Sequence, residues 1–377
     1  MVALFWGSVL AVLYTYLGYP AILCILSIIR GRKEALPEGA YRPRVTLVIA
    51  ARNEEKRIRK KLENTLDIEY PRDRLEVIVA SDASTDGTDD IVRAHADRGI
   101  TLVRAPGRRG KEFAQRCALD KATGEIMVFS DVATMIETDG IARIVYNFSD
   151  PTVGCVSSED RILDEQGHVS GEGAYVRYEM WLRSLETQVN SVVGLSGSFF
   201  AARAEVCRDW PTTIPSDFNT LLNSVRLGLR GVSDPSSIGV YTTIEDENKE
   251  FDRKVRTITR GITALMANAG LLNPFRYGIF SWQLASHKLM RWLVPWFLVM
   301  AFLSNLALVF RSAVYAGIFV LHAAFYGWAF LGGKVAVGGS RTIRIPHYFV
   351  QANRAIAWAW VAYLKGERFV TWNPSTR

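Results

Sequence analysis

The sequence predicts an α/β fold, with a mostly parallel sheet in the middle of the chain and transmembrane helices at both ends. Two observations support this prediction. Between residues 45 and 130, short apolar runs alternate with helical patterns, and both ends of the 377-residue chain are long apolar stretches with few charges. With 49% hydrophobic residues, the chain can bury a substantial core.

Four apolar runs predict the central strands, at residues 45–51, 75–80, 100–104 and 126–130. Such runs are typical of strands that are buried on both faces of a parallel sheet. Helical patterns lie between them, at residues 54–66, 89–98 and 111–121. This alternation of strand and helix predicts parallel strands joined by right-handed crossovers.

Polar clusters follow three of these strands. "ARNEE" follows the first, "SDASTDGT" the second and "SDVAT" the fourth. The carboxyl ends of parallel strands meet at one edge of the sheet, where ligands bind. Asp86 and Thr88 alone would be a turn and a helix cap, and we expect them to cap the next helix. Three polar strand ends at one edge together favour a binding site.

Transmembrane helices are predicted at residues 1–30 and in a hairpin at residues 292–333. No charged residue occurs from residue 2 to residue 29, which is longer than the ~20 residues needed to span a bilayer. A cleaved signal peptide is the alternative, but its apolar core has only about 7–15 residues. We therefore expect a retained helix. Arg311 separates the two apolar runs of the hairpin.

Two further segments are expected at the membrane surface. Residues 273–291 interleave aromatic with basic side chains, which predicts an interfacial amphipathic helix. Residues 345–364 are apolar but contain an arginine and two amides, which are costly in hydrocarbon. The segment 334–377 is therefore expected to be interfacial or re-entrant, followed by a tail.

The charge distribution predicts the topology. Basic residues follow the first helix and the hairpin, and the positive-inside rule places both flanks in the cytoplasm. A domain at residues 31–272 is then cytoplasmic, at a bacterial-type inner membrane. The net charge of +7 suits an anionic membrane surface. The sequence has no basic helix or aromatic RNA motif, so we expect no nucleic-acid partner.

With these motifs, the chain resembles family 2 glycosyltransferases of the Rossmann-like GT-A fold. The resemblance is greatest to the membrane-embedded relatives of cellulose, chitin and hyaluronan synthases, and it covers nearly all of the chain after Arg44. It implies an inverting transferase that uses a nucleotide-diphosphate sugar, expected to be a UDP-sugar, and Mg²⁺ or Mn²⁺.

The resemblance also assigns the nucleotide pocket, whose lining would be Ala50, Arg52, Asn53 and Glu54. Asp82 would accept a hydrogen bond from the uracil ring N–H. "GRRGKEFAQR" resembles the Gly-Lys element of the family, so Gly110 and Lys111 are expected near the nucleotide or its phosphates. The alternative is a solvated basic loop.

The metal motif is matched in part. Many relatives have Asp-x-Asp where this chain has Asp131, Val132 and Ala133, so Asp131 is the expected metal ligand and the second acid is missing. Mg²⁺ and Mn²⁺ prefer oxygen ligands, which diphosphate and water can complete. Thr134 or Glu137 are the residues that could compensate.

"TIPSDFNTLLNSVRLGLR" resembles the segment that carries the catalytic base, with Asp217 at the base position. Inversion needs one base to deprotonate the acceptor hydroxyl. The alternative is that Ser216 or Asp217 caps a helix. "VVGLSGSFFAARAEV" resembles the acceptor-side segment, and the turn Ser196-Gly197-Ser198 in it could equally be a plain turn.

The last segments that carry the resemblance are rich in basic residues. "DRKVRTITRG" resembles the Gln-x-x-Arg-Trp signature, with Arg253 at the Gln position, Arg256 at the Arg position and Thr257 at the Trp position. These arginines could neutralise the leaving diphosphate; a basic helix on lipid headgroups is the alternative. The tail "GERFVTWNPSTR" resembles a gating tail, with Trp372 and Arg377 as contacts that could close over the nucleotide. The alternative is a frayed terminus.

The function predicted from the sequence is sugar transfer to a lipid-linked or growing polysaccharide acceptor at the cytoplasmic membrane face. Membrane lipids are expected partners, and a homo-oligomer is allowed. One alternative is a polyprenyl-phosphate glycosyltransferase, whose acceptor is a phosphate. Another is a non-catalytic membrane partner of a synthase, which Ala133 and Thr257 would permit.

Overall fold

The computed structural model describes residues 1–30, 41–163, 174–242, 247–332 and 341–369. The chain divides into two compact units. The sheet unit contains Leu26–Glu245 and Ala264–Ser281, and the helical unit contains Met1–Ile25, Asp246–Thr263 and Trp282–Arg368. The segment that starts at Asp246 was expected in the domain 31–272, but it groups with the apolar helices.

The first half of the sheet is parallel, as predicted. It consists of β1 (Val45–Ala51), β2 (Leu75–Ser81), β3 (Ile100–Arg104) and β4 (Ile126–Asp131). Their order is β3-β2-β1-β4, and each neighbouring pair is parallel. All seven residues of β1 are buried, which explains its continuous apolar run.

The second half of the sheet is mixed, which the sequence did not predict. It continues from β4 through β7 (Phe199–Arg203), β6 (Val153–Leu163), β8 (Arg230–Thr242) and β5 (Met135–Ile136). β7 is antiparallel to both β4 and β6, whereas β6 and β8 are parallel. Four of the seven strand pairings are parallel, so the predicted mostly parallel sheet is confirmed.

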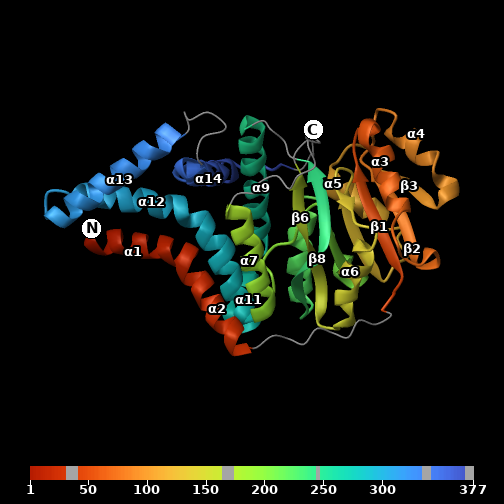
Figure 1. Ribbon diagram of the computed structural model, residues 1–377, viewed down its shortest axis with the longest axis horizontal. Helices are drawn as coiled ribbons and strands as arrows, with labels where there is room; N and C mark the ends of the chain where they lie inside the picture. Colours follow the sequence, from red (N-terminus) through yellow and green to blue (C-terminus); the bar gives the residue numbers. More distant parts are fainter. Residues whose placement is uncertain (31–40, 164–173, 243–246, 333–340, 370–377) are drawn as a thin grey trace. The chain divides into compact units, whose positions relative to one another are not determined.

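Helices cover both faces of the sheet. They are α3 (Glu55–Leu66), α4 (Thr88–Arg93), α5 (Lys111–Leu119), α6 (Gly140–Tyr146), α7 (Ala174–Val189) and α8 (Ser216–Arg226). On one face, Leu47 and Ile49 of β1 share a core with Ile58 of α3, Val92 of α4 and Ile144 of α6. The helix α5 packs against β1, β2 and β3, and Figure 1 shows α3 and α4 beside the same strands.

The helical unit contains the long apolar helices. α1 (Val2–Leu13) continues through a π-helical turn (Tyr14–Gly18) into α2 (Tyr19–Arg30). Pro20 lacks the amide that an α-helix uses for hydrogen bonding, and the π-turn lies directly before it. Further along the chain are α9 (Glu247–Ala267), α12 (Met290–Leu308), α13 (Ala313–Gly332) and α14 (Arg341–Leu364).

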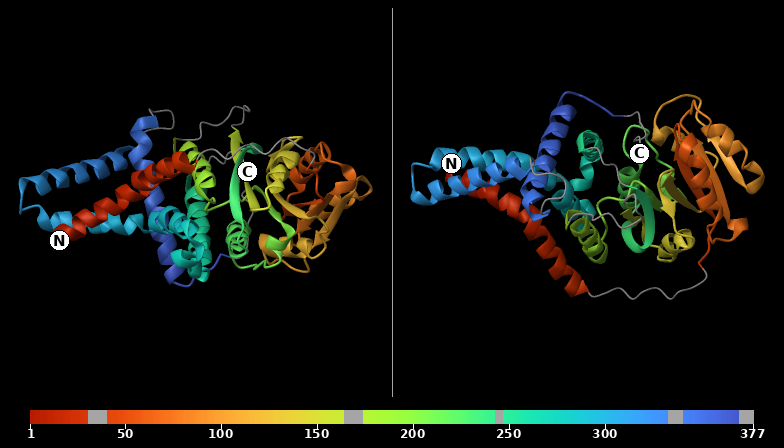
Figure 2. Two further views of the ribbon diagram at one scale, coloured as in Figure 1. Left: turned by 90° about the horizontal axis from the view of Figure 1, so that it is seen from below. Right: turned by 45° about the horizontal axis from the view of Figure 1, so that its top comes forward.

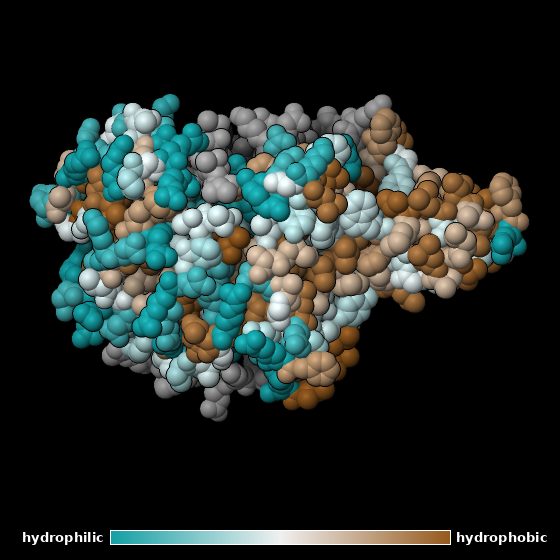
Figure 3. Space-filling view, turned by 180° about the vertical axis from the view of Figure 1, so that it is seen from behind, coloured by the Kyte–Doolittle hydropathy of each residue, from teal (hydrophilic) through white to brown (hydrophobic). Residues whose placement is uncertain are grey.

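Three helical stretches among the described residues are long and apolar enough to cross a membrane: Val2–Arg30, Ile279–Leu308 and Ala313–Gly332. They correspond to the predicted N-terminal helix and hairpin. Figure 2 shows α13 returning alongside α12. The surface over these two helices is mostly hydrophobic, as Figure 3 shows.

The predicted interfacial helix 273–291 is divided in the structure. The short helix α10 (Pro274–Tyr277) ends at Gly278, whose φ of 55° favours glycine and breaks the helical path. A new helix, α11 (Ile279–Leu284), then continues through a π-turn (Ala285–Leu289) into α12. The apolar stretch therefore starts at Ile279, earlier than the predicted residue 292.

Candidate functional site

The parallel strands bring the predicted polar clusters to one edge of the sheet. In register, Ala50 of β1 lies beside Ala80 of β2 and Asp131 of β4. Ala50 is buried, and the segments that follow these three strands begin at this edge. The shared edge follows from the parallel direction of the strands.

The segment after β1 is bound to the loop after β2. The Nη1 of Arg52 donates to the carbonyl oxygen of Asp82 at 2.9 Å and also to that of Ala83. The Oδ1 of Asn53 accepts from the amide of Thr85 at 2.9 Å. Arg52 and Asn53, which were predicted to line a nucleotide pocket, thus hold the two loops together.

Two residues other than glycine have a left-handed backbone at this edge. Asn53 has a φ of 50° and Ala83 a φ of 52°. Asparagine adopts this region fairly often, but alanine rarely does. Such conformations persist where surrounding contacts fix them, and they concentrate at functional sites.

Asp86 caps the next helix, α4, as predicted, and it also binds the start of α3. The hydroxyl of Thr88 binds the start of α3 and not that of the next helix. The Oδ1 of Asp86 accepts from the amide of Thr88, and its Oδ2 accepts from the amide of Glu55, both at 3.1 Å. The hydroxyl of Thr88 accepts from the amide of Glu54 at 2.7 Å. Burial raises the pKa of Asp86, but the hydrogen bonds from Thr88 and Glu55 outweigh it and leave that pKa below its ordinary value. The side chain of Glu54 pairs with Arg57 at 2.7 Å.

Asp82 holds the loop before α5. Its carboxylate accepts from the amides of Arg109, at 2.8 Å, and Gly110, at 3.1 Å, and the residue is only 1% exposed. Gly110 has a φ of 102°, which explains why glycine stands there. The sequence assigned Asp82 to the uracil ring. The observed contacts give its carboxylate a positioning role, and contact with a base stays a prediction.

Lys111 contacts the predicted metal ligand directly. Its Nζ lies 2.5 Å from Oδ1 of Asp131 and donates to the carbonyl of Gly197 at 3.0 Å. Burial lowers the pKa of Lys111, but Asp131 outweighs it and leaves the pKa raised, with a smaller contribution from Asp217. Lys111 is therefore a charged ammonium group that lies between the carboxyl end of β4 and the turn before β7.

A second lysine lies behind Asp131, and the sequence analysis missed it. Lys61 of α3 is fully buried, and its Nζ donates to the hydroxyl of Ser130 at 2.8 Å and to the carbonyl of Thr134 at 2.5 Å. Burial lowers the pKa of Lys61 to about 7, and the charge of Asp131 opposes this shift. The sequence signal is a lysine within the apolar stripe of α3, one residue before Leu62 and three after Ile58.

Asp160 is a further buried acid that the sequence analysis missed. It lies near the end of β6, and its carboxylate accepts from the hydroxyls of Ser196, at 2.8 Å, and Ser198. Burial raises the pKa of Asp160, and Asp131 contributes in the same direction. Asp160 thus fixes the turn whose Gly197 carbonyl accepts from Lys111. The polar run "SSED" at the end of an apolar strand was the available signal.

Asp217 lies on the other side of the same turn. A Cβ on Gly197 would be 3.3 Å from Oδ2 of Asp217, so only glycine permits this close approach without displacement. Pro215 occupies the N-cap of α8, where no side chain makes a capping hydrogen bond. The capping interpretation of Ser216 and Asp217 is therefore wrong. Among the described residues, none donates a hydrogen bond to the half-buried carboxylate of Asp217.

The remaining predicted site residues lie outside the sheet unit or outside the described residues. Arg253 and Arg256 belong to α9, in the part of the chain that forms the helical unit. Burial lowers the pKa of Arg256, and the neighbouring Arg260 and Arg253 lower it further. Trp372 and Arg377 lie beyond the last described residue.

The residues at the sheet edge could bind a divalent cation through a single protein carboxylate. Asp131 is partly exposed and provides a hard oxygen ligand. Mg²⁺ is commonly bound by one or two carboxylates together with substrate phosphates and water. Ala133 cannot contribute, and Glu137 pairs with Arg143 at 2.8 Å. Within the described ranges, no three His, Cys, Asp or Glu side chains gather closely enough to hold a metal by themselves.

Comparison with known proteins identifies the class of this domain. Residues 46–209 match the family described as Glycosyl transferase family 2. A mannosyltransferase from Pyrobaculum calidifontis, solved in complex with GDP-Man and Mn²⁺, has a similar fold, with a TM-score of 0.76. The two sequences are 24% identical, and the match covers 97% of this chain and 100% of that chain. Residues 46–209 are therefore a family 2 glycosyltransferase domain, and the fold is GT-A-like, which confirms the resemblance for this domain.

Two curated relatives add detail. The beta-monoglucosyldiacylglycerol synthase of Nostoc sp. is 28% identical over 225 residues, which are 57% of this chain and 48% of that protein. The poly-beta-1,6-N-acetyl-D-glucosamine synthase of Staphylococcus aureus is 24% identical over 195 residues, 50% of this chain and 46% of that protein. The chain thus spans about half the length of the curated relatives it matches.

Proposed function

We propose that this protein is a membrane-bound, inverting glycosyltransferase. It transfers a sugar from a nucleotide-diphosphate sugar, expected to be a UDP-sugar, to a lipid-linked or growing polysaccharide acceptor. The observation that carries the proposal is the arrangement of Asp131, Lys111 and Asp217 around the Gly197 turn, at the carboxyl edge of a family 2 domain.

The donor would bind at the edge formed by β1, β2 and β4. Lys111 provides a positive charge, and the loop held by Asp82 presents Gly110 and its neighbours to the phosphates. A Mg²⁺ or Mn²⁺ ion held by Asp131 would neutralise charge on the diphosphate when bound. The mutual attraction of Lys111 and Asp131 keeps both groups at this edge before the donor arrives.

Asp217 would act as the general base. Its carboxylate takes the proton from the acceptor hydroxyl as the hydroxyl oxygen attacks the anomeric carbon. The bond to the nucleoside diphosphate breaks on the opposite face, which inverts the configuration, and no protein acid is needed because the diphosphate leaves as an anion. Its partly exposed carboxylate accepts no hydrogen bond from the described residues, so its lone pairs are available for this proton.

Residues of α9 and the tail extend this proposal. Arg253 and Arg256 would neutralise the leaving diphosphate. Burial, followed by the neighbouring Arg260 and Arg253, lowers the pKa of Arg256, and a bound anion would offset both effects. Contact of the same helix with lipid headgroups is the alternative. Trp372 and Arg377 would close over the nucleotide as a lid.

The names of the relatives support the acceptor class. One makes beta-monoglucosyldiacylglycerol, a glycolipid, and the other makes a polysaccharide. The candidate spans support an integral membrane protein, which we place in a bacterial-type inner membrane with the sheet unit cytoplasmic. We expect membrane lipids as partners and allow a homo-oligomer. A polyprenyl-phosphate acceptor is the second candidate, since a phosphate needs no base.

Nucleotide-sugar turnover tests the proposal. The purified protein is incubated with UDP-sugars and with GDP-mannose, each with Mg²⁺, Mn²⁺ or a chelator, and release of nucleoside diphosphate is measured with and without lipid acceptors. We expect metal-dependent turnover of at least one UDP-sugar. Turnover of GDP-mannose alone would overturn the UDP assignment. Absence of binding and turnover for every donor would instead favour a non-catalytic membrane partner.

A further inference from the structure

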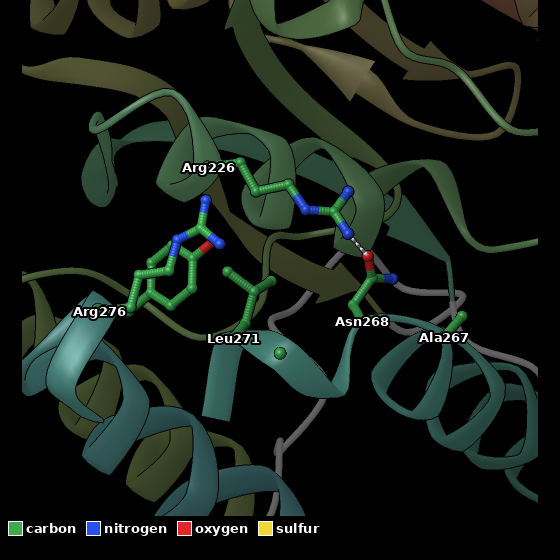
Figure 4. A pocket seen from close by; sticks show the side chains of 7 residues that line it. Arg226, Ala267, Asn268, Leu271 and Arg276 are labelled. Atoms are coloured by element: carbon green, nitrogen blue, oxygen red, sulfur yellow. Dashed lines mark hydrogen bonds between the residues drawn. The ribbon is translucent and has the colours of Figure 1, made fainter. Parts of the chain in front are cut away.

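A cationic pocket lies in the sheet unit, away from the residues proposed for catalysis. Its volume is about 330 Å³, and it is lined by Arg226, Ala267, Asn268, Gly270, Leu271, Arg276 and Tyr277. Figure 4 shows the two arginines reaching the pocket from different elements, with Leu271 between them. None of its lining residues is acidic, so the pocket carries two positive charges without a lining counter-charge.

The polar groups of this pocket are held in place. Arg226 stands in the last turn of α8, where the helix dipole favours a cation, and it donates to Oδ1 of Asn268. The Nδ2 of Asn268 donates to the carbonyl of Ala264 at 2.7 Å, which fixes the amide. The guanidinium of Arg276 lies 5.3 Å from the ring centre of Tyr277. The guanidinium of Arg226 is thus oriented by Asn268, whereas Arg276 is exposed and contacts the ring of Tyr277.

The covalent chain connects the pocket closely to a candidate membrane span. Arg276 and Tyr277 directly precede Ile279, the first residue of a candidate membrane span. Only Gly278 separates Tyr277 from this span. Phe275, next to Arg276, is 99% exposed, which is unusual for phenylalanine in water but common where aromatic side chains enter the lipid interface.

We propose that this pocket binds the phosphate of an anionic phospholipid headgroup, with Arg226 and Arg276 as its ligands and Phe275 among the adjoining acyl chains. Guanidinium groups bind phosphate oxygens through two parallel hydrogen bonds, which suits a pocket with two of them. A soluble phosphate would use the arginines but would gain nothing from Phe275. The exposed aromatic side chain and the adjacent span therefore favour a lipid.

The pocket and the proposed base share one helix. Arg226 ends α8 and Asp217 lies in its first turn, so about 14 Å of helix separates them along the axis. A headgroup bound at Arg226 would fix the depth of that end of α8 relative to the bilayer. The lipid would thereby help to present Asp217 to an acceptor that is itself anchored in the membrane.

Lipid retention by the full-length protein tests the proposal. The protein is purified in a mild detergent, supplied with equal amounts of phosphatidylglycerol and phosphatidylcholine, and analysed by native mass spectrometry. We expect preferential retention of phosphatidylglycerol. Arg276→Gln should weaken that retention by about tenfold, the usual effect of losing one charge-assisted hydrogen bond. Phe275→Ser should weaken it to a smaller extent.

Arg311→Gln is the matched control, because Arg311 is an exposed arginine between two candidate spans and lies outside the pocket. It should retain phosphatidylglycerol like the wild type. Arg226→Gln provides a second pocket variant, and thermal unfolding in detergent verifies that each variant is folded. Equal retention by the Arg276→Gln, Arg226→Gln and Arg311→Gln proteins would overturn the proposal. So would thermal stabilisation by inorganic phosphate equal to that by phosphatidylglycerol, since that result identifies a soluble-anion site.

Discussion

On the donor side of the site, most polar side chains form hydrogen bonds with backbone groups and fix the loops. On the acceptor side, the carboxylate of Asp217 does not have this structural role. The donor half comprises the ends of β1, β2 and β4; there, Asp82 accepts from two loop amides and Asp86 accepts from two helix N-termini. The acceptor half comprises the Ser196–Ser198 turn with Asp160 and Asp217. Asp160 holds the turn, and Asp217 approaches it without a hydrogen bond from the described residues.

This difference separates positioning from chemistry. Two backbone amides bind the buried carboxylate of Asp82, so this side chain holds a loop in place. The carboxylate of Asp217 is partly exposed and accepts no hydrogen bond from the described residues, which leaves it open to an acceptor hydroxyl. The contrast therefore predicts that substitutions in the two halves will affect different measurable quantities.

The largest expected effect is on catalysis by Asp217. Asp217→Asn should lower kcat by ~10²–10⁴, the usual contribution of a general base, while nucleotide binding stays unchanged. Steady-state kinetics and calorimetric titration with UDP would measure the two quantities. Asp209→Asn, which changes an exposed acid in the same region, is the control. Transfer that survives within a few-fold would favour a phosphate acceptor instead.

The next effect concerns Asp131 in the donor half. Asp131→Ala removes the expected metal ligand and the partner of Lys111, so UDP affinity in the presence of Mn²⁺ should fall by at least ~10–100-fold. Affinity without metal should change little. Isothermal titration with and without chelator measures this, and Glu137→Gln serves as the control because Glu137 pairs with Arg143. A variant with wild-type affinity in Mn²⁺ would exclude Asp131 as a ligand.

A smaller effect on catalysis is expected for Asp160, which acts indirectly by fixing the Ser196–Ser198 turn. Asp160→Ala removes the acceptor for two serine hydroxyls and should lower kcat by about tenfold, through displacement of Gly197. Asp160→Asn keeps an oxygen acceptor and should recover much of the activity. Rescue by asparagine supports a positioning role. An asparagine variant as impaired as the alanine variant would show that the charge itself is required.

The last effect concerns stability and not turnover, and it is the pH dependence of stability that Lys61 causes. Its pKa is about 7 in the folded protein, below the ordinary lysine value of 10.5, so between these pH values the unfolded chain binds more protons. Stability should therefore rise from pH 7 toward pH 10, by up to about 1.4 kcal/mol per pH unit from this group. Lys61→Met should remove this rise in the thermal unfolding midpoint. Lys60→Met changes an exposed neighbour and should preserve it; an identical pH profile for both variants would contradict the prediction.

Sequence reasoning performed well where function depends on local order. The parallel strands, the polar strand ends, the cap of α4 by Asp86 and the apolar helices are each encoded in consecutive residues, because periodicity and turn chemistry are local properties. It performed less well in the second half of the sheet. There, β7 runs antiparallel to β4, and no local pattern records which strand a segment pairs with.

The sequence by itself determined the alternating fold, the edge of the sheet that carries the site, the membrane-crossing candidates and the identity of Asp131, Lys111 and Asp217 as functional candidates. Only the tertiary structure decided that Lys111 pairs with Asp131 and that Lys61 is buried next to the end of the same strand. It also decided that Asp160 binds the turn at Gly197 and that Arg226 and Arg276 line one pocket. The physical reason is that each of these contacts joins side chains that are 20 or more residues apart, as between Lys111 and Asp131. Such side chains meet only when helices and strands pack, and the burial that packing imposes sets their charge and their hydrogen-bond partners.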